Sequence, residues 1–202
     1  MVGDHSISIG SALASIKCNN NLGVIWFDAH GDFHTFDTTP SGNIHGIPLA
    51  AITNYEKRFL SDFHTGNFYN FKNTVIVGAR DLEPEEIENA KKAGITIFWN
   101  EDIKKYGAED ICNKAFEIAK YNTNGIHISF DLDLIDPNFA PGVSVPASNG
   151  ISLETAYSMI DYIIAHKNCV KSMDLVEFNP LTDIKNQTEY IAKNILKKLS
   201  LR

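Results

Sequence analysis

The sequence Gly-Val-Ile-Trp-Phe at residues 23–27 is a short apolar run that breaks off at Asp28, a pattern typical of a buried β-strand. Runs of the same kind recur at residues 74–78, 95–99, 125–130 and 170–176. Strands with apolar residues at consecutive positions are typical of a sheet that is covered on both faces. The sequence therefore predicts five buried strands.

Helical patterns separate these strands. The clearest begins at Pro84, has Glu85 and Glu86 in its first turn, and ends at Gly94, a residue typical of the position just past a helix. Apolar residues also recur at three- and four-residue spacing at 108–121, 153–166 and 189–199. Because parallel strands need crossover connections, we expect an α/β fold with three layers and a mostly parallel sheet. We expect residues 1–202 to form a single domain, since no linker or repeat interrupts the pattern.

The composition argues against several classes of protein. The net charge is −7, and Lys and Arg are interspersed with acidic residues, which disfavours a nucleic-acid partner. No apolar run is long enough to cross a bilayer and no apolar leader follows Met1, so we expect a cytoplasmic protein that does not bind membranes. Cys18, Cys112 and Cys169 form no Cys-x-x-Cys pair, which predicts reduced thiols.

Acidic residues and histidines follow two of the predicted strands. Asp28, His30 and Asp32 alternate after residues 23–27, and in an extended backbone all three would point the same way. Asp131 and Asp133 repeat this spacing after residues 125–130. Carboxylates that are this close would retain protons unless divalent cations lay between them. Because oxygen ligands outnumber nitrogen ligands and none is a thiolate, Mn²⁺ or a similarly hard ion is expected rather than structural zinc.

With His5 added, the candidate ligands outnumber those that one ion usually takes from a protein, so two ions that share carboxylates fit better. A single Asp-x-Asp or Asp-x-His is usually a solvated loop or a cap, and the prediction depends on the combination of clusters. His64, His127 and His166 belong to no such cluster, and we expect them to be ordinary surface or core residues.

Several motifs together resemble those of the arginase/agmatinase superfamily, in residue type, order and approximate spacing. They are Gly-Asp-His-Ser (3–6), Asp-Ala-His-Gly-Asp (28–32), Ser-Gly-Asn-Ile-His-Gly (41–46), Ser-Phe-Asp-Leu-Asp (129–133), Asp-Pro-Asn-Phe-Ala-Pro-Gly (136–142) and Glu-Phe-Asn-Pro (177–180). The resemblance runs from Gly3 to the last predicted helix and is closest to arginases. It implies the arginase fold. Members normally carry a substantial segment before Gly-Asp-His, so the chain is expected to be truncated at its N-terminus.

The resemblance also implies two Mn²⁺ ions. Asp28 and Asp131 would bridge the ions, His5 and Asp32 would complete one ligand set, and His30 and Asp133 would complete the other. In the family, water activated by the two ions attacks a guanidinium carbon.

Three residues resemble the family's catalytic groups. Asp32 would orient the attacking water, and His45 would carry protons to the leaving amine. Glu177 would pair with the substrate guanidinium, and the alternative is that it caps a helix before Asn179 and Pro180.

The loop at residues 39–49 resembles the one by which arginases hold the amino-acid end of arginine. Ser41 and Asn43 would hydrogen-bond the substrate carboxylate, and Glu83 and Glu86 would help to recognise the same end of the substrate. His34 replaces an Asn that usually contacts this carboxylate, Glu83 replaces an Asp, and Val145 replaces a Thr commonly found near the guanidinium.

The resemblance thus implies hydrolysis of arginine to ornithine and urea, by a homo-oligomer that is a trimer or a hexamer. An agmatinase, guanidinobutyrase or formimidoylglutamase is the first alternative. The second is an inactive metal-binding fragment, or a subunit completed by another polypeptide, because the strand at 170–176 would be an edge and His5 would have no anchored strand before it. The Gly-rich phosphate loops of nucleotide-binding folds are absent from the sequence.

Overall fold

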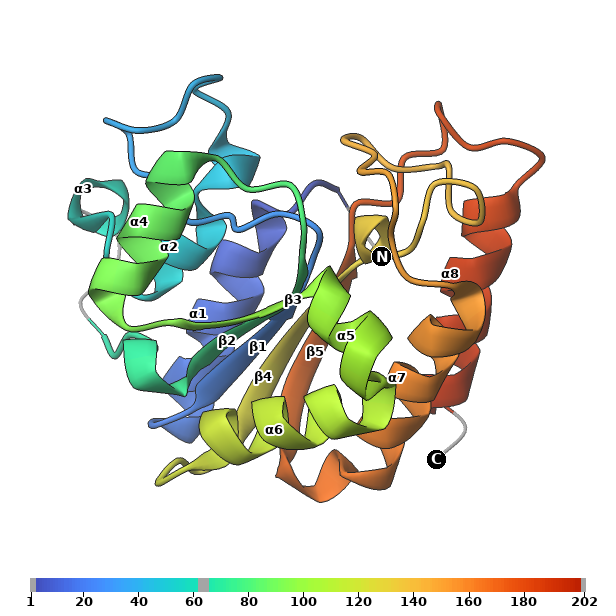
Figure 1. Cartoon of the computed structure of the whole chain (residues 1–202). Coiled ribbons are helices and arrows are strands. Elements are labelled where there is room, and N and C mark those ends of the chain that lie inside the picture. The colour runs from blue at the N-terminus through green and yellow to red at the C-terminus, as the bar shows by residue number, and fades with distance from the viewer. Residues whose placement is uncertain (1–2, 62–65, 201–202) are drawn as a thin grey trace.

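The computed structural model describes residues 3–61 and 66–200, so His64 lies outside the described residues. One parallel sheet has the strand order β3-β2-β1-β4-β5. Its strands are β1 (Gly23–Phe27), β2 (Thr74–Ala79), β3 (Thr96–Trp99), β4 (Ile126–Asp131) and β5 (Val170–Val176). Each strand begins and ends within one residue of the predicted run. Helices cover both faces of the sheet (Figure 1), which confirms the predicted three-layer α/β fold.

The helices are α1 (Ile7–Asn19), α2 (Pro48–Ile52), α3 (Lys57–Leu60), α4 (Pro84–Ala93), α5 (Asn100–Tyr106), α6 (Ala108–Lys120), α7 (Leu153–Ala165) and α8 (Gln187–Ser200). Pro84 and Gly94 bound α4 as predicted, and Gly94 adopts a left-handed φ of 83°. The spacing did not predict α1, α2, α3 and α5. Helices α2, α3 and α5, of five, four and seven residues, are too short to show a repeated apolar face. Helix α1 has 13 residues, but it buries Ser8 and Ser15 together with its apolar residues, which weakens the pattern.

The alternating side chains of the strands face two separate cores. In β1, Val24 and Trp26 pack on the side that holds α1, α2 and α4, whereas Ile25 and Phe27 pack on the side of α5, α6, α7 and α8. Both sides are fully buried, which explains why the strands are continuous apolar runs.

The strand order places one strand pair at the centre of the functional edge. From β1 the chain passes outward to β2 and β3, then returns to β4 on the other side of β1 and continues to β5. The connections therefore diverge between β1 and β4. In open α/β sheets, ligands bind beyond the carboxyl ends of the strands at such a point. The prediction that β5 is an edge strand is confirmed by the same order.

Gly78 lets a neighbouring turn close against β1. Its φ is 102°, and a Cβ at this position would lie 2.0 Å from Leu134 Cδ1 and 3.2 Å from the carbonyl oxygen of Asp28. Leu134 ends the short 3-10 turn η3 (Leu132–Leu134), which follows β4. A side chain at position 78 would therefore push this turn away from the end of β1.

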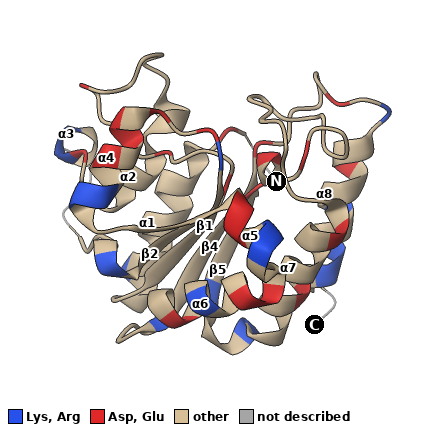
Figure 2. Ribbon diagram, viewed as in Figure 1, with Lys and Arg blue, Asp and Glu red and all other residues tan. Residues whose placement is uncertain are grey.

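Charged residues of both signs lie on the outer helices. Lys and Arg are dispersed over several outer helices, interspersed with acidic residues, in the view of Figure 2. Within residues 3–61 and 66–200, no helix is both long enough and apolar enough to span a membrane.

Candidate metal centre

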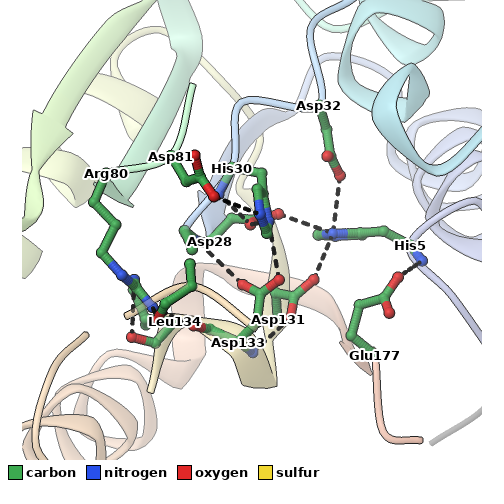
Figure 3. Close-up of polar contacts among 12 residues, drawn as sticks. His5, Asp28, His30, Asp32, Arg80, Asp81, Asp131, Asp133, Leu134 and Glu177 are labelled. Atoms are coloured by element: carbon green, nitrogen blue, oxygen red, sulfur yellow. Dashed lines mark hydrogen bonds and ion pairs between the residues drawn. The ribbon is translucent and has the colours of Figure 1, made fainter. Parts of the chain in front are cut away.

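Two groups of acidic and histidine side chains meet at the carboxyl ends of β1 and β4 (Figure 3). In the first group, His5 Nδ1 lies 2.9 Å from Asp28 Oδ2 and 3.0 Å from both Asp32 Oδ2 and Asp131 Oδ2. In the second group, His30 Nδ1 lies 3.0 Å from Asp133 Oδ2 and 3.4 Å from Asp28 Oδ1. Asp28 therefore belongs to both groups and presents one oxygen to each.

The groups are tied together by backbone amides. The amide of Asp133 donates to Asp131 Oδ1 at 2.7 Å, and the amide of Ala29 donates to Asp133 Oδ1 at 3.2 Å. The amide of His30 donates to Asp28 Oδ1 at 2.7 Å. Turns after β1 and β4 thus orient Asp28 and Asp131, and a contact between the two segments orients Asp133.

The predicted extended backbone from Asp28 to Asp32 is wrong. The chain bends at Ala29 and His30, and Asp32 has a left-handed φ of 49°. A non-glycine residue persists in this conformation only where its surroundings hold it. Here the amides of Leu49 and Ala50, at the start of α2, donate to the carbonyl oxygen of Asp32 at 3.1 and 3.3 Å.

No strand precedes His5 in the described part of the chain, as expected, but the residue is anchored by the end of β5. Its backbone amide donates to Glu177 Oε1 at 2.7 Å, and the amide of Glu177 donates to the carbonyl oxygen of Gly3 at 3.2 Å. Its ring stacks on Trp26 with centroids 4.0 Å apart. Glu177 has a φ of 64° and follows β5 directly, and no described helix begins between it and Gln187, so the helix-capping alternative is wrong.

Burial and mutual repulsion make this centre retain protons. Burial, then the charges of Asp133 and Asp28, raise the pKa of Asp131 well above its usual range, and burial with Asp28 raises the pKa of Asp32 to about 6. Burial alone would lower the pKa of His30, but contacts with Asp133 and Asp28 raise it to about 12. A cation between these groups would replace the protons and hold the carboxylates ionised.

The donor atoms fit divalent cations. His5 Nδ1, Asp32 Oδ2 and Glu177 Oε2 are buried and make no hydrogen bond, although His5 Nδ1 and Asp32 Oδ2 lie only 3.0 Å apart. Such atoms are costly in a protein interior unless a ligand satisfies them. The two groups offer mainly carboxylate oxygens together with one imidazole nitrogen each, a donor set that suits Mn²⁺ or a related hard ion.

A cavity of about 260 Å³ opens above this centre. All the predicted site residues except the fully buried Asp28 line it, namely His5, His30, Asp32, His34, Ser41, Asn43, His45, Glu83, Glu86, Asp131, Asp133 and Glu177. His45 lies in the 3-10 turn η1 (Ile44–Gly46). Val145 lines the same cavity, as do Thr39, Pro40 and Gly46, which belong to the loop at residues 39–49 but had no role assigned to them individually.

The far end of the cavity is formed by a histidine between two acids. His34 Nε2 lies 3.1 Å from Glu83 Oε2 and 3.5 Å from Glu86 Oε2, and Nδ1 lies 3.1 Å from Thr38 Oγ1. Both ring nitrogens of His34 therefore already have partners. Glu86 is buried, whereas half of the Glu83 side chain is exposed.

Arg80 supports the centre, and sequence reasoning missed it. Its guanidinium donates to the carbonyl oxygens of Asp133 at 2.6 Å, Ala147 at 2.8 Å, and both Leu134 and Ser148 at 3.2 Å. Figure 3 shows Arg80 beside Asp133 and Leu134. One side chain thus joins η3 to the loop that follows it. No local spacing signals this role, because the acceptors are backbone atoms more than fifty residues away.

The chain belongs to the arginase family, whose sequence model matches residues 1–201. It is 40% identical over 193 residues to the arginase of Brevibacillus brevis and 37% identical over 199 residues to that of Bacillus subtilis, and it covers 64% and 66% of these relatives. These matches span 94% and 98% of the chain itself.

A solved structure supports the same assignment. The crystal structure of arginase from Bacillus cereus superimposes with a TM-score of 0.91 at 37% identity, covering 98% of this chain and 68% of that one. The formimidoylglutamase of Bacillus subtilis, at 24% identity and a TM-score of 0.82, shares the fold.

Proposed function

We propose that this chain forms one catalytic domain that hydrolyses arginine to ornithine and urea, with two Mn²⁺ ions as cofactors. The observation that carries the proposal is Asp28, whose two oxygens face the two separate histidine groups at the base of a polar cavity. A carboxylate shared in this way is typical of centres with two adjacent ions. A cytoplasmic location and a homo-oligomer, trimeric or hexameric, belong to the same proposal and rest on the family resemblance.

One ion would be held by His5, Asp28, Asp32 and Asp131, and the other by Asp28, His30, Asp131 and Asp133. Bound there, divalent cations would lower the pKa of water and so supply a nucleophile near neutral pH. The reaction would join the oxygen of a water molecule to the guanidinium carbon and break the bond from that carbon to Nε of arginine. The nitrogen leaves as the amine of ornithine after it gains a proton.

The remaining site residues would orient the reactants. Asp32 Oδ2 is buried without a hydrogen-bond partner and would accept a hydrogen bond from the attacking water. Glu177 Oε2 is likewise buried without a hydrogen-bond partner and would accept a hydrogen bond from the substrate guanidinium. His45 lines the cavity on a short turn, where it would deliver a proton to the leaving amine.

The loop above the cavity would bind the amino-acid end of the substrate. Ser41 and Asn43 are exposed at its mouth, and a hydrogen bond of 3.1 Å from the Asn43 amide to Ser41 Oγ fixes the turn between them. These groups would hydrogen-bond the carboxylate of arginine, and Glu83 and Glu86 would face its ammonium group. His34 would reach the carboxylate only by exchanging its contact with Glu83 or Thr38.

The identity of the substrate can be tested by measuring product release from several candidates. Urea release from arginine, agmatine and guanidinobutyrate, and ammonia or formamide release from formiminoglutamate, should be compared with Mn²⁺ present. We expect arginine to be far better than agmatine, because agmatine leaves carboxylate partners unpaired at a cost of about 1 to 3 kcal/mol each. A preference for agmatine would overturn the arginine assignment. No turnover by a chain that binds Mn²⁺ would favour the inactive-fragment alternative.

Metal removal tests the centre independently of turnover. Each ion at a concentration of about 100 times its Kd should add about 2.7 kcal/mol of stability, so chelation with EDTA should lower the Tm by several degrees. Asp28→Asn replaces the carboxylate shared by both groups with a neutral amide and should make the Tm nearly insensitive to Mn²⁺. Asp161→Asn, a change of the same charge at an exposed position on α7, is the matched control and should keep the native response.

A further inference from the structure

A chain of hydrogen bonds runs from the His5 ring into the sheet beneath the candidate centre. His5 Nε2, on the opposite side of the ring from the carboxylates, lies 2.8 Å from Ser129 Oγ. Ser129 Oγ donates in turn to Asp174 Oδ1. Ser129 lies on β4 and Asp174 on β5, and the parallel register sets them opposite each other. Residues separated by more than forty positions in the sequence are thus placed behind one imidazole ring.

The direction of these hydrogen bonds follows from a count of donors and acceptors. An ionised carboxylate can only accept, and contacts with His127, Ser11 and Ser129 outweigh burial and lower the pKa of Asp174 to about 2. The single proton of the Ser129 hydroxyl is therefore committed to Asp174. Ser129 Oγ can then only accept from its other neighbours, which are His5 Nε2 and the hydroxyl of Ser8 at 3.1 Å.

This direction fixes the tautomer of His5. If Ser129 accepts, Nε2 must carry the hydrogen, and a neutral His5 then has its lone pair on Nδ1. Nδ1 is the atom that faces Asp28, Asp32 and Asp131 and that lacks a hydrogen-bond partner. A metal-binding histidine needs this arrangement, since only an unprotonated nitrogen can coordinate a cation.

We propose that Ser129 and Asp174 are positioning residues that hold His5 as the Nε2–H tautomer and so prepare its Nδ1 to bind the ion of the first group. The role rests on the metal centre of the proposed function, but it concerns residues that touch no ion. Ser11, one turn of α1 after Ser8, donates to the second oxygen of Asp174 and so holds the carboxylate in place. Two serines of α1 therefore hold the pair in place, Ser8 by its contact with Ser129 and Ser11 by its contact with Asp174.

His127 completes the surroundings of Asp174 without belonging to this path. Its Nε2 lies 3.3 Å from Asp174 Oδ2, and its Nδ1 lies 2.6 Å from Ser172 Oγ. Ser172 also donates to Ser15 Oγ at 2.6 Å, so its hydroxyl faces His127 and α1 rather than Ser129 or His5. Ser172 is therefore a matched control for the loss of a serine hydroxyl in the same layer.

The test is the affinity of each site for Mn²⁺, measured from the electron paramagnetic resonance signal of free Mn²⁺ during titration. We expect Ser129→Ala and Asp174→Ala each to weaken one of two binding events about 10- to 100-fold, the range usual for partners of metal-bound histidines. The second event, at His30, should be unchanged. Ser172→Ala should bind both ions as the native chain does. The double variant Ser129→Ala/Asp174→Ala should be no weaker than the worse single variant, because both residues act through one path.

The possible outcomes separate this role from the metal centre itself. Native chain that binds no Mn²⁺ would overturn the centre and the positioning role together. Native chain that binds two ions, with unchanged affinities in Ser129→Ala, would overturn the positioning role alone. Equal weakening in Ser172→Ala would show a general packing effect and would also overturn it. If Asp174→Ala does not fold, the comparison of Ser129→Ala with Ser172→Ala still decides.

Discussion

The indole ring of Trp26 lies flat against the imidazole of His5, with centroids 4.0 Å apart and planes 7° from parallel. Its Nε1 also donates to Asp28 Oδ2 at 3.0 Å. One buried residue of β1 therefore orients two members of the first group, one by stacking and one by a charge-assisted hydrogen bond.

This contact makes Trp26 an internal reporter of metal binding. Paramagnetic Mn²⁺ bound beside His5 should quench the fluorescence of Trp26, and Trp26→Phe should abolish the quenching. Trp99→Phe is the control, because Trp99 ends β3 and is separated from β1 by β2, so its loss should leave the quenching intact. Trp26→Phe should also weaken Mn²⁺ binding about 10- to 100-fold, since a hydrogen bond to a charged group contributes about 1.5 to 3 kcal/mol. Unchanged affinity would limit Trp26 to a packing role.

Gly78→Ala should destabilise the chain by about 2 to 4 kcal/mol in urea denaturation, because it combines a left-handed φ with a collision against Leu134. Gly94→Ala separates the two causes, since Gly94 has a φ of 83° but open space around it, and should cost only about 1 to 2 kcal/mol. Leu134→Ala added to Gly78→Ala should recover part of the loss. Equal costs at both glycines would argue that the collision is relieved elsewhere.

Glu86→Gln should change how stability depends on pH. Burial, followed by the contact with Glu83, raises the pKa of Glu86 to about 9 from an ordinary value of 4.5. The folded state therefore binds this proton more tightly than the unfolded chain, and the resulting stabilisation is full below 4.5 and lost as the pH rises through about 9.

Glutamine does not titrate, so the variant should lose less stability over this interval, by up to about 1.4 kcal/mol per pH unit. Urea denaturation of metal-free protein at about pH 6 and about pH 8 measures the difference. Glu85→Gln makes the same charge change on an exposed part of α4 and should behave as the native chain. If the free energy of unfolding of Glu86→Gln changed with pH as that of the native chain does, ionisation of Glu86 would have no effect on stability.

His45→Ala should lower turnover about 10²- to 10⁴-fold while Mn²⁺ content stays the same, because a general acid or base usually contributes this much. Ile44→Ala, at the exposed neighbouring position of η1, tests whether disturbance of the turn alone accounts for the loss. Steady-state rates and elemental analysis of the same preparations make the comparison. Equal rates in native and His45→Ala protein would assign His45 a structural role.

Much of the fold and of the candidate site could be predicted from the sequence. The five strands are apolar runs because both faces of the sheet are covered, and this signal is local to each run. Asp28 and Asp131 stand at the ends of two such runs, so their presence at one edge of a parallel sheet followed from the fold class. The helix α4 could also be predicted, since Pro84 and Gly94 mark its ends.

Tertiary structure alone decided how these residues meet. The left-handed backbone of Asp32 depends on amides of α2, the support of His5 depends on Glu177, and the tautomer of His5 depends on Ser129 and Asp174. Each of these contacts joins segments whose distance is set by strand order and register rather than by neighbouring residues. The sequence by itself determined which side chains reach the sheet edge, because strand ends and turn residues are local signals. Long-range packing determined their orientation, because hydrogen-bond partners of a buried group are fixed only when distant elements come together.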